Sequence, residues 1–283
     1  MIPLPSVPRL HFVTFATPAF RVRQRLLNLS ARWFGEVDRL HVWTKERLAA
    51  DGFPVRHAEL FPNSIGFGWY AWKPYIILQA LDEAEVDDLV IYQDVGRREP
   101  VAISRSLREW DGFLSQRGWP CVAGLRIPEW GANKLWTKSG VFKATKLDGP
   151  QYMDAAQVQA SWSVWRKCPK TLAFVQEWAS LCQRLELVGG QLENGVDGEM
   201  PGFHEHRWDQ SLLTLLALRE DMPVLDPSAL HVSSLNGKSI DSFGKPSPTA
   251  KGFDSFMGLV RLYFLAEQAV KKIGLGRSRP HAR

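Results

Sequence analysis

The stretch from Gly66 to Arg98 constrains the fold of this chain more than any other feature. A helical segment at 74–84 leads through a short acidic turn into Leu89-Val90-Ile91-Tyr92, an apolar run typical of a buried strand. Asp94 follows that strand, next to a glycine-containing loop. Open α/β sheets bind ligands outside the carboxyl ends of their strands. The stretch therefore predicts an α/β fold with a polar site at Asp94.

The same alternation of strand and helix occurs earlier in the chain. We expect strands at 10–15, 39–44 and 89–92 and helices at 19–34, 45–50 and 74–84. This order predicts a mostly parallel α/β sheet flanked by helices, Rossmann-like and in a single domain. Later patterns predict helices at 104–116, 139–146, 169–187 and 208–218, strands at 121–125, 157–165 and 223–225, a loop at 128–137, and a C-terminal amphipathic helix at 253–273.

Charge and composition exclude several classes of protein. The net charge is +5, but Lys271, Lys272, Arg277, Arg279 and Arg283 supply five positive charges beyond position 270, so the body is neutral. A neutral body argues against nucleic acid as a partner. No apolar run approaches the ~20 residues of a membrane span. No signal peptide is evident and the three cysteines form no disulfide or zinc pattern, so we expect a cytoplasmic location.

Two positions near the expected sheet edge are candidates for binding phosphate or metal. Lys73 stands among Trp69, Tyr70 and Trp72, so its ammonium would meet a diphosphate while an aromatic ring stacks on a base. The alternative is a surface lysine beside a hydrophobic staple. Asp94 would coordinate a divalent cation, Mn²⁺ or Mg²⁺, or else cap the turn that follows it.

Polar residues in the second half of the chain are candidates for ligand binding and catalysis. Asp209 and Gln210 begin the helix predicted at 208–218, where Asp209 would act as a general base, as an electrostatic stabiliser or as a helix cap. Lys138, Asp154 and Gln159 are further polar candidates; a solvated lysine face is the alternative for Lys138.

Five segments in this order resemble a family: GFGWYAWKPYIILQAL, DDLVIYQDVG, LWTKSGVFKATKLD, QVQASWSVWRKCPKTLAFVQEWASLC and HEHRWDQSLLTLLA. They are similar to bacterial GT-A-like glycosyltransferases of surface-polysaccharide biosynthesis, such as those of capsule and O-antigen. These proteins typically run Tyr/Trp-x-x-Trp-Lys-Pro-Tyr-Ile-Ile-Leu, then Tyr-x-Asp-x-Gly, then His-Arg-x-Asp-Gln-Ser. The resemblance covers roughly residues 10–235.

The resemblance implies a GT-A-like domain at 1–250 that binds a nucleotide sugar, followed by the helix and basic tail at 251–283. It implies transfer of a hexose, from a UDP-sugar in the favoured reading, to a glycan or lipid-linked acceptor. Lys138, in the segment that matches the family's basic middle segment, would contact phosphate, and Asp154 and Gln159 would hydrogen-bond sugar hydroxyls. His206 and Arg207 would join Asp154 at the acceptor. His231 loosely resembles the metal-binding histidine of glycogenin-type transferases and would join Asp94 at the metal; the alternative is a loop histidine whose hydrogen bonds are satisfied.

Two alternatives remain open at this point. A non-catalytic scaffold that binds a nucleotide or sugar is favoured by Asp94-Val95-Gly96, where many GT-A enzymes carry a second acid. The C-terminal helix with its basic tail either lies on an anionic membrane surface, which would make the protein peripheral on the inner face, or docks on the body.

Overall fold

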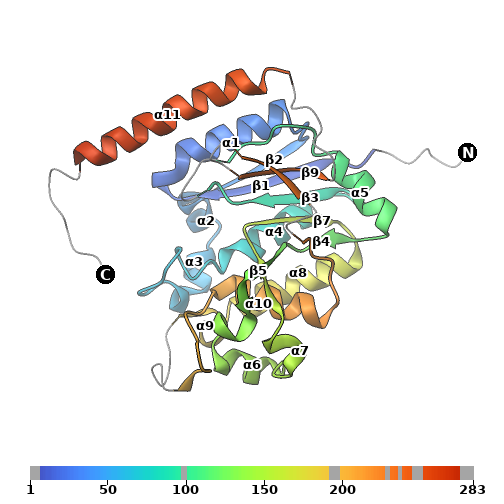
Figure 1. Ribbon diagram of the computed structural model, residues 1–283, viewed down its shortest axis with the longest axis vertical. Coiled ribbons are helices and arrows are strands. Elements are labelled where there is room, and N and C mark those ends of the chain that lie inside the picture. The colour runs from blue at the N-terminus through green and yellow to red at the C-terminus, as the bar shows by residue number, and fades with distance from the viewer. Residues whose placement is uncertain are drawn as a thin grey trace, which may run out of the picture.

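A five-stranded mixed sheet forms the centre of the computed structural model (Figure 1). The structure describes residues 7–96, 101–190, 198–226, 230–234, 238–243 and 251–274. The sheet order is β2-β1-β3-β7-β4, with β1 parallel to β2 and β3, and β7 antiparallel to β3 and β4. Its strands are β1 (Leu10–Ala16), β2 (Arg39–Thr44), β3 (Leu89–Gln93), β4 (Cys121–Val122) and β7 (Trp162–Arg166). The prediction of a mostly parallel α/β sheet is therefore confirmed.

Helices cover both faces of this sheet. The longer ones are α1 (Arg21–Trp33), α4 (Trp72–Glu83), α5 (Glu109–Arg117), α8 (Pro169–Cys182), α10 (Trp208–Arg219) and α11 (Phe253–Gly274). Shorter ones are α2 (Lys45–Ala50), α3 (Phe53–Arg56), α6 (Ser139–Thr145), α7 (Pro150–Met153), α9 (Leu185–Val188) and the 3₁₀ turns η1 (Pro18–Phe20), η2 (Ala58–Leu60) and η3 (Asn133–Leu135). The predicted helix at 104–116 begins later, at Glu109, and the helix predicted at 169–187 is interrupted between α8 and α9.

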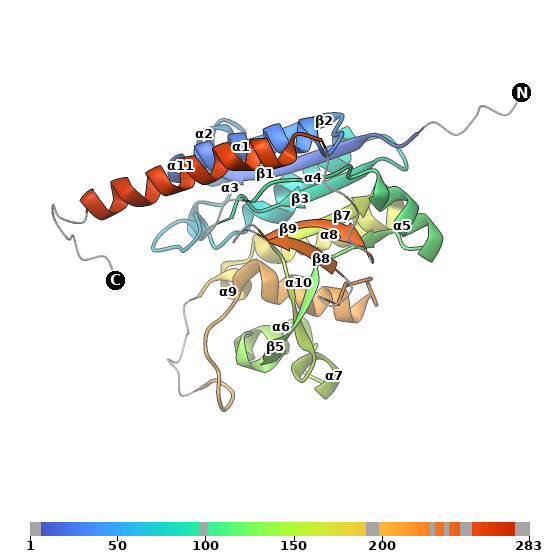
Figure 2. The ribbon, with the colours of Figure 1, turned by 45° about the horizontal axis from the view of Figure 1, so that its top comes forward.

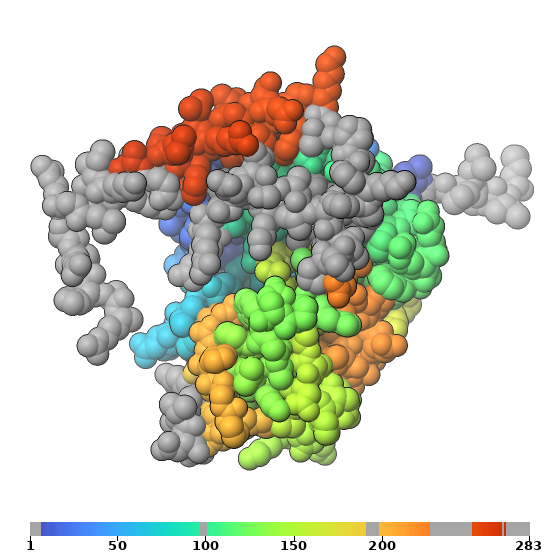
Figure 3. Space-filling model, in the orientation of Figure 1, coloured from blue at the N-terminus to red at the C-terminus, as the bar shows by residue number. Residues whose placement is uncertain are grey.

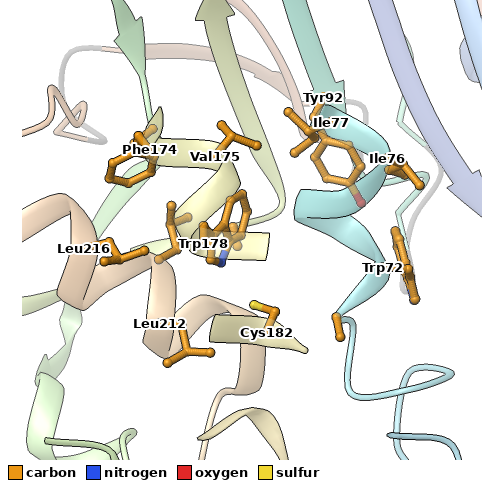
Figure 4. Close-up of a cluster of buried hydrophobic side chains, with 14 of the residues drawn as sticks. Trp72, Ile76, Ile77, Tyr92, Phe174, Val175, Trp178, Cys182, Leu212 and Leu216 are labelled. Carbon is orange, nitrogen blue, oxygen red and sulfur yellow. The ribbon is translucent and has the colours of Figure 1, made fainter. Parts of the chain in front are cut away.

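Strand β3 shows how the sequence divides the core into two layers. Val90 and Tyr92 point to one face and join the cluster formed with α4, α8 and α10, part of which Figure 4 shows. Leu89 and Ile91 point to the other face and join the cluster formed with α1 and α5. A strand with both faces covered must be apolar at every position, which explains the continuous hydrophobic run that the sequence displays.

A second, two-stranded sheet replaces two of the predicted elements. The segment 157–165 is not one strand but two, β6 (Ala156–Gln159) and β7, and β6 pairs with β5 (Leu125–Ala132) instead of the central sheet. The prediction of a loop at 128–137 was wrong for residues 128–132, which belong to β5. Pro128 is compatible with this strand because β5 is an edge strand, where a residue without an N–H need not break a ladder hydrogen bond. The strand predicted at 223–225 is reduced to one parallel bridge between Leu225 and Leu125.

The C-terminal helix α11 lies beside α1 in both ribbon views (Figures 1 and 2). Its Phe253, Phe256, Met257 and Val260 pack with Ala102 against Leu26 and Phe34. A hairpin of β8 (Leu230–Ser234) and β9 (Lys238–Phe243) precedes it. Among the described residues, no helix combines the length and the apolar character that crossing a membrane requires.

Candidate functional site

Three charged side chains from separate segments meet at the carboxyl edge of the sheet. Lys73 comes from the first turn of α4, Asp94 from the residue after β3, and Asp209 from the first turn of α10. Lys73 Nζ lies 3.1 Å from Asp209 Oδ2 and 3.8 Å from Asp94 Oδ1. The Lys73 and Asp209 side chains are 5% and 4% exposed, whereas that of Asp94 is 40% exposed. The sequence predicted all three residues, and the structure brings them together.

Neighbouring hydrogen bonds hold the Asp94 carboxylate and the backbone of both aspartates. Tyr92 Oη donates to Asp94 Oδ1, since residues two apart on a strand face the same side. The backbone N–H of Asp94 donates to the carbonyl of Ser161 over 2.8 Å. Trp178 Nε1 donates to the backbone carbonyl of Asp209 over 3.0 Å, which ties α8 to the start of α10. The cluster is therefore held by both the sheet and the helix layer beneath it.

The buried cluster has unusual acid–base properties. Burial raises the pKa of Asp209 to about 6; Lys73 opposes that shift and the Asp94 charge adds to it. Burial acts to lower the pKa of Lys73, but Asp209 and Asp94 outweigh it and the net shift is upward. Lys73 thus stays cationic at neutral pH, while Asp209 is a carboxylate whose affinity for a proton is enhanced. The pKa of Asp209 is therefore close to the value that suits proton transfer at neutral pH.

A left-handed turn precedes α4 and shapes the wall of the cluster. Five consecutive residues have positive φ: Gly66 65°, Phe67 61°, Gly68 80°, Trp69 56° and Tyr70 61°. Each non-glycine residue in this conformation costs about 1–2 kcal/mol. A Cβ on Gly66 would lie 2.2 Å from Tyr70 Cε2, so only glycine leaves space for the tyrosine ring. Strain of this kind is retained when the surrounding structure requires it, and it is common at functional sites.

The turn places aromatic rings beside Lys73. The Tyr70 ring centre is 5.5 Å from Lys73 Nζ and 5.4 Å from the Trp208 ring centre. Trp69 is buried and contacts Trp208 at 6.5 Å. Trp72 is buried in the core instead: it stacks on Phe15 at 3.8 Å and donates through Nε1 to the Gly66 carbonyl. Tyr70 and Trp208 are therefore the partly exposed rings of this group.

Several predicted site residues make structural contacts away from Lys73. Lys138 Nζ donates to the carbonyl of Gly189 over 2.9 Å. His206 Nε2 donates to the carbonyl of Leu187 over 2.8 Å, and burial together with Lys138 lowers the pKa of His206 to about 3, so this ring is neutral. Gln210 Nε2 donates to Gln157 Oε1 over 2.6 Å in a buried network.

The remaining predicted residues lie nearer the surface. Asp154 is exposed and pairs with Lys134, Nζ to Oδ1, at 2.7 Å. Gln159 is half-buried in β6. The Arg207 guanidinium lies over the rings of Trp130 at 4.8 Å and Trp208 at 5.4 Å, so it extends the aromatic wall outward from Asp209. His231 belongs to β8, and its side chain lies outside the described residues.

The residues present allow only a limited metal site. Within the described ranges, no group of three or more histidine, cysteine, aspartate or glutamate side chains is arranged to hold a metal ion. Asp94 Oδ1 receives Tyr92 Oη and faces Lys73, whereas Oδ2 of the same half-exposed carboxylate has no hydrogen bond with any described residue. One outward carboxylate oxygen fits a divalent cation whose other ligands are phosphate oxygens and water.

Two surface hollows lie elsewhere, one of about 190 Å³ at α6, α8 and α10 and one of about 300 Å³ at β6 and α10. Both are lined largely by aliphatic side chains and share no residue with the Lys73 cluster. The cluster remains the better candidate because it brings opposite charges together at the sheet edge and because burial raises the pKa of Asp209.

Sequence reasoning missed three groups that build the site: Tyr92, Trp178 and Trp208. Tyr92 stands two residues before Asp94, and Trp208 is adjacent to Asp209, so the strand period and chain adjacency were the available signals. Trp178 had no such signal, because its contact depends on how α8 and α10 pack. Comparison with protein-family models and with curated proteins gave no match for this chain.

Proposed function

We propose that this protein is a glycosyltransferase that moves a hexose from a nucleoside-diphosphate sugar, with UDP favoured, to a glycan or lipid-linked acceptor. The observation that carries the proposal is the convergence of Lys73, Asp94 and Asp209 at the carboxyl edge of a mostly parallel sheet. Ligand chemistry in open α/β sheets is located at this edge. The five motifs that resemble GT-A-like transferases contribute all three residues.

Asp209 serves as the base or positioning group for the acceptor hydroxyl. Its pKa of about 6 leaves it ionised at neutral pH and able to accept a proton. Lys73 holds Asp209 and Asp94 at fixed separation, because its ammonium lies between the two carboxylates. The Lys73 side chain is only 5% exposed, which disfavours the direct contact with the diphosphate that the sequence suggested. In this arrangement Lys73 acts on the donor through Asp94.

The donor would meet Asp94 and the aromatic wall. A divalent cation on Asp94 Oδ2 would supply positive charge for the leaving diphosphate. Tyr70 and Trp208 are partly exposed next to the cluster, and such rings stack on bases and on the apolar faces of sugars. Arg207 and Trp130 continue this surface away from Asp209, on the side where an acceptor would lie.

The test measures donor binding and turnover separately. The full chain is titrated with UDP- and GDP-sugars with and without Mn²⁺, and release of nucleoside diphosphate is followed with candidate acceptors. Asp94→Asn should weaken metal-stimulated donor binding, whereas Asp209→Asn should keep the donor and lose turnover by about 10²–10⁴-fold. Asp82→Asn is the matched control, because Asp82 is exposed on the same helix as Lys73. Unchanged donor binding in Asp94→Asn would remove Asp94 from the site.

One observation favours a second candidate, a non-catalytic nucleotide- or sugar-binding scaffold. Of the three charged residues, only Asp94 is substantially exposed. The charges of Lys73 and Asp209 are therefore largely satisfied by each other inside the protein, which leaves less charge to bind a substrate. The same experiment separates the two functions. Donor binding without release of nucleoside diphosphate for any acceptor would support the scaffold, whereas release that depends on Asp209 would support the transferase.

A further inference from the structure

Exposed apolar side chains gather on two neighbouring helices that carry none of the three charged residues of the candidate site. Among the described residues, ten large apolar side chains are exposed, and six of them belong to α1 and α11. On α11 these are Leu259, Leu262 and Leu265, each about two-thirds exposed; on α1 they are Trp33, Leu29 and Val22. Figure 3 shows α11 running along one outer edge of the molecule. Large apolar side chains concentrated in this way mark an interaction surface.

The spacing of these residues defines one continuous face on each helix. Leucines at 259, 262 and 265 follow one side of α11, opposite the side that packs on α1 through Phe253, Phe256 and Val260. Residues 22, 29 and 33 follow one side of α1, and Trp33 contacts Phe256 of α11 at 6.0 Å between ring centres. Trp33 thus lies beside the packed side of α11, so the two stripes flank the contact between α1 and α11. We call this surface, with residues 22, 29, 33, 259, 262 and 265, the α1–α11 face.

Basic residues surround the α1–α11 face. Helix α1 contains four arginines and no acid, and its Arg25 and Arg32 are exposed. Helix α11 exposes Arg261 and, in its first turn, Asp254, while its Glu267 forms an ion pair with buried Arg23 at 2.8 Å. The sequence beyond Glu267 adds five Lys and Arg residues and no acid. The surface is thus apolar at its centre and cationic around it.

This combination identifies the partner. A second copy of the chain on the same face would bring arginines against arginines, which costs free energy. A bilayer with anionic headgroups complements both features, since the leucines and Trp33 enter the headgroup boundary while the arginines meet phosphates. We propose that the α1–α11 face docks the protein on the surface of an anionic membrane. The docking surface then includes α1 and the folded part of α11, and is not confined to the basic tail.

The test uses co-sedimentation of the full chain with phosphatidylcholine vesicles that contain or lack phosphatidylglycerol, at low and high salt. The wild type should bind only the anionic vesicles and should be released by salt. The triple variant Leu259→Ser, Leu262→Ser, Leu265→Ser should lose at least about tenfold in partitioning. Its matched control changes Val7, Val55 and Val86 to Ser, since these three are somewhat more exposed than the leucines but lie outside the face.

A second pair of variants isolates the charge. Arg25→Glu with Arg261→Glu should abolish binding, whereas Lys143→Glu with Lys170→Glu, which changes net charge equally on exposed positions elsewhere, should keep most of it. Circular dichroism confirms that each variant is folded. Absence of wild-type binding, equal loss in both triple variants, or unaltered binding of the leucine variant would overturn the proposal. So would light scattering that shows a dimer lost in the leucine variant. None of these readouts depends on sugar transfer.

Discussion

Replacing Lys73 with Met tests whether the charged cluster is buried and coupled. Lys73 Nζ lies 3.1 Å from Asp209 Oδ2, and both side chains are at most 5% exposed. Met is similar in length to Lys and fills most of the same volume without the charge. The substitution therefore removes the cation and leaves Asp209 as a buried carboxylate whose attraction to a neighbouring ammonium is lost.

The magnitude follows from the distance and the burial. At an effective dielectric constant of about 20, the Lys73–Asp209 attraction at this distance is about 5 kcal/mol. Removing one partner of a buried pair typically costs about 3–5 kcal/mol of unfolding free energy. In the variant, Asp209 limits this cost by binding a proton. The free energy of that protonation becomes more favourable by about 1.4 kcal/mol for each pH unit below neutrality. Wild-type Asp209, with a pKa of about 6, gains only part of this stabilisation between pH 7 and 5. The destabilisation should therefore shrink by about 1–2 kcal/mol at pH 5.

Urea unfolding of wild type and variant at pH 7 and pH 5 measures both effects, with matching transitions by fluorescence and circular dichroism as the check on two-state behaviour. Lys134→Met is the control, because Lys134 Nζ lies closer to its partner, 2.7 Å from Asp154, but these side chains are 38% and 57% exposed. Such an exposed pair should cost less than about 1 kcal/mol. If Lys73→Met destabilises no more than Lys134→Met, the cluster is not the low-dielectric site that the argument requires.

Three further outcomes are expected. Turnover should fall as pH drops through about 6, because protonation removes Asp209 as a base; a rate that is flat down to pH 5 would contradict that role. Burial lowers the pKa of His41 to about 4, so the contribution of neutral His41 to stability is complete above pH 6.5 and is lost as pH falls toward 4. The urea midpoint of the wild type should therefore fall more steeply with decreasing pH than that of His41→Gln, and parallel pH profiles would refute this account. Gly190→Ala should destabilise by about 1–3 kcal/mol, because its Cβ would lie 2.8 Å from Trp69 Cζ3, whereas Gly140→Ala, with open space around it, should not; equal midpoints for the two variants would refute the contact.

The sequence predicted the parts of the site that depend on local pattern. The apolar run of β3 specifies a strand buried on both faces, and parallel strands end at a common edge, so the position of Asp94 followed. Lys73 was predicted near Asp94 because a helix that precedes a strand begins near the edge where the strand ends. These inferences need only periodicity and the rules of α/β connection.

The remaining features depend on tertiary contacts that no local pattern encodes. The residues at 157–165 alternate as one strand would, but the chain turns at Ala160 and Ser161, and this turn lets β6 leave the central sheet. Lys138 and His206 have the residue types of a ligand site, yet backbone carbonyls of the segment near Gly189 occupy them. A polar side chain in a motif is equally suited to satisfy a buried carbonyl, and only the fold decides between these uses.

Arg23 connects the two surfaces to which we assign functions. This buried residue of α1 donates through Nη1 to the carbonyl of Gly96 at 3.0 Å and pairs through Nη2 with Glu267 of α11 at 2.8 Å. Gly96 is two residues beyond Asp94, so one guanidinium contacts both the docked C-terminal helix and the loop that carries the outward carboxylate. Because a buried guanidinium requires its partners, a displacement of α11 that broke the pair with Glu267 would destabilise Arg23, which also donates to the Gly96 carbonyl. The Arg23 contacts therefore couple the position of α11 to that of the loop that follows Asp94.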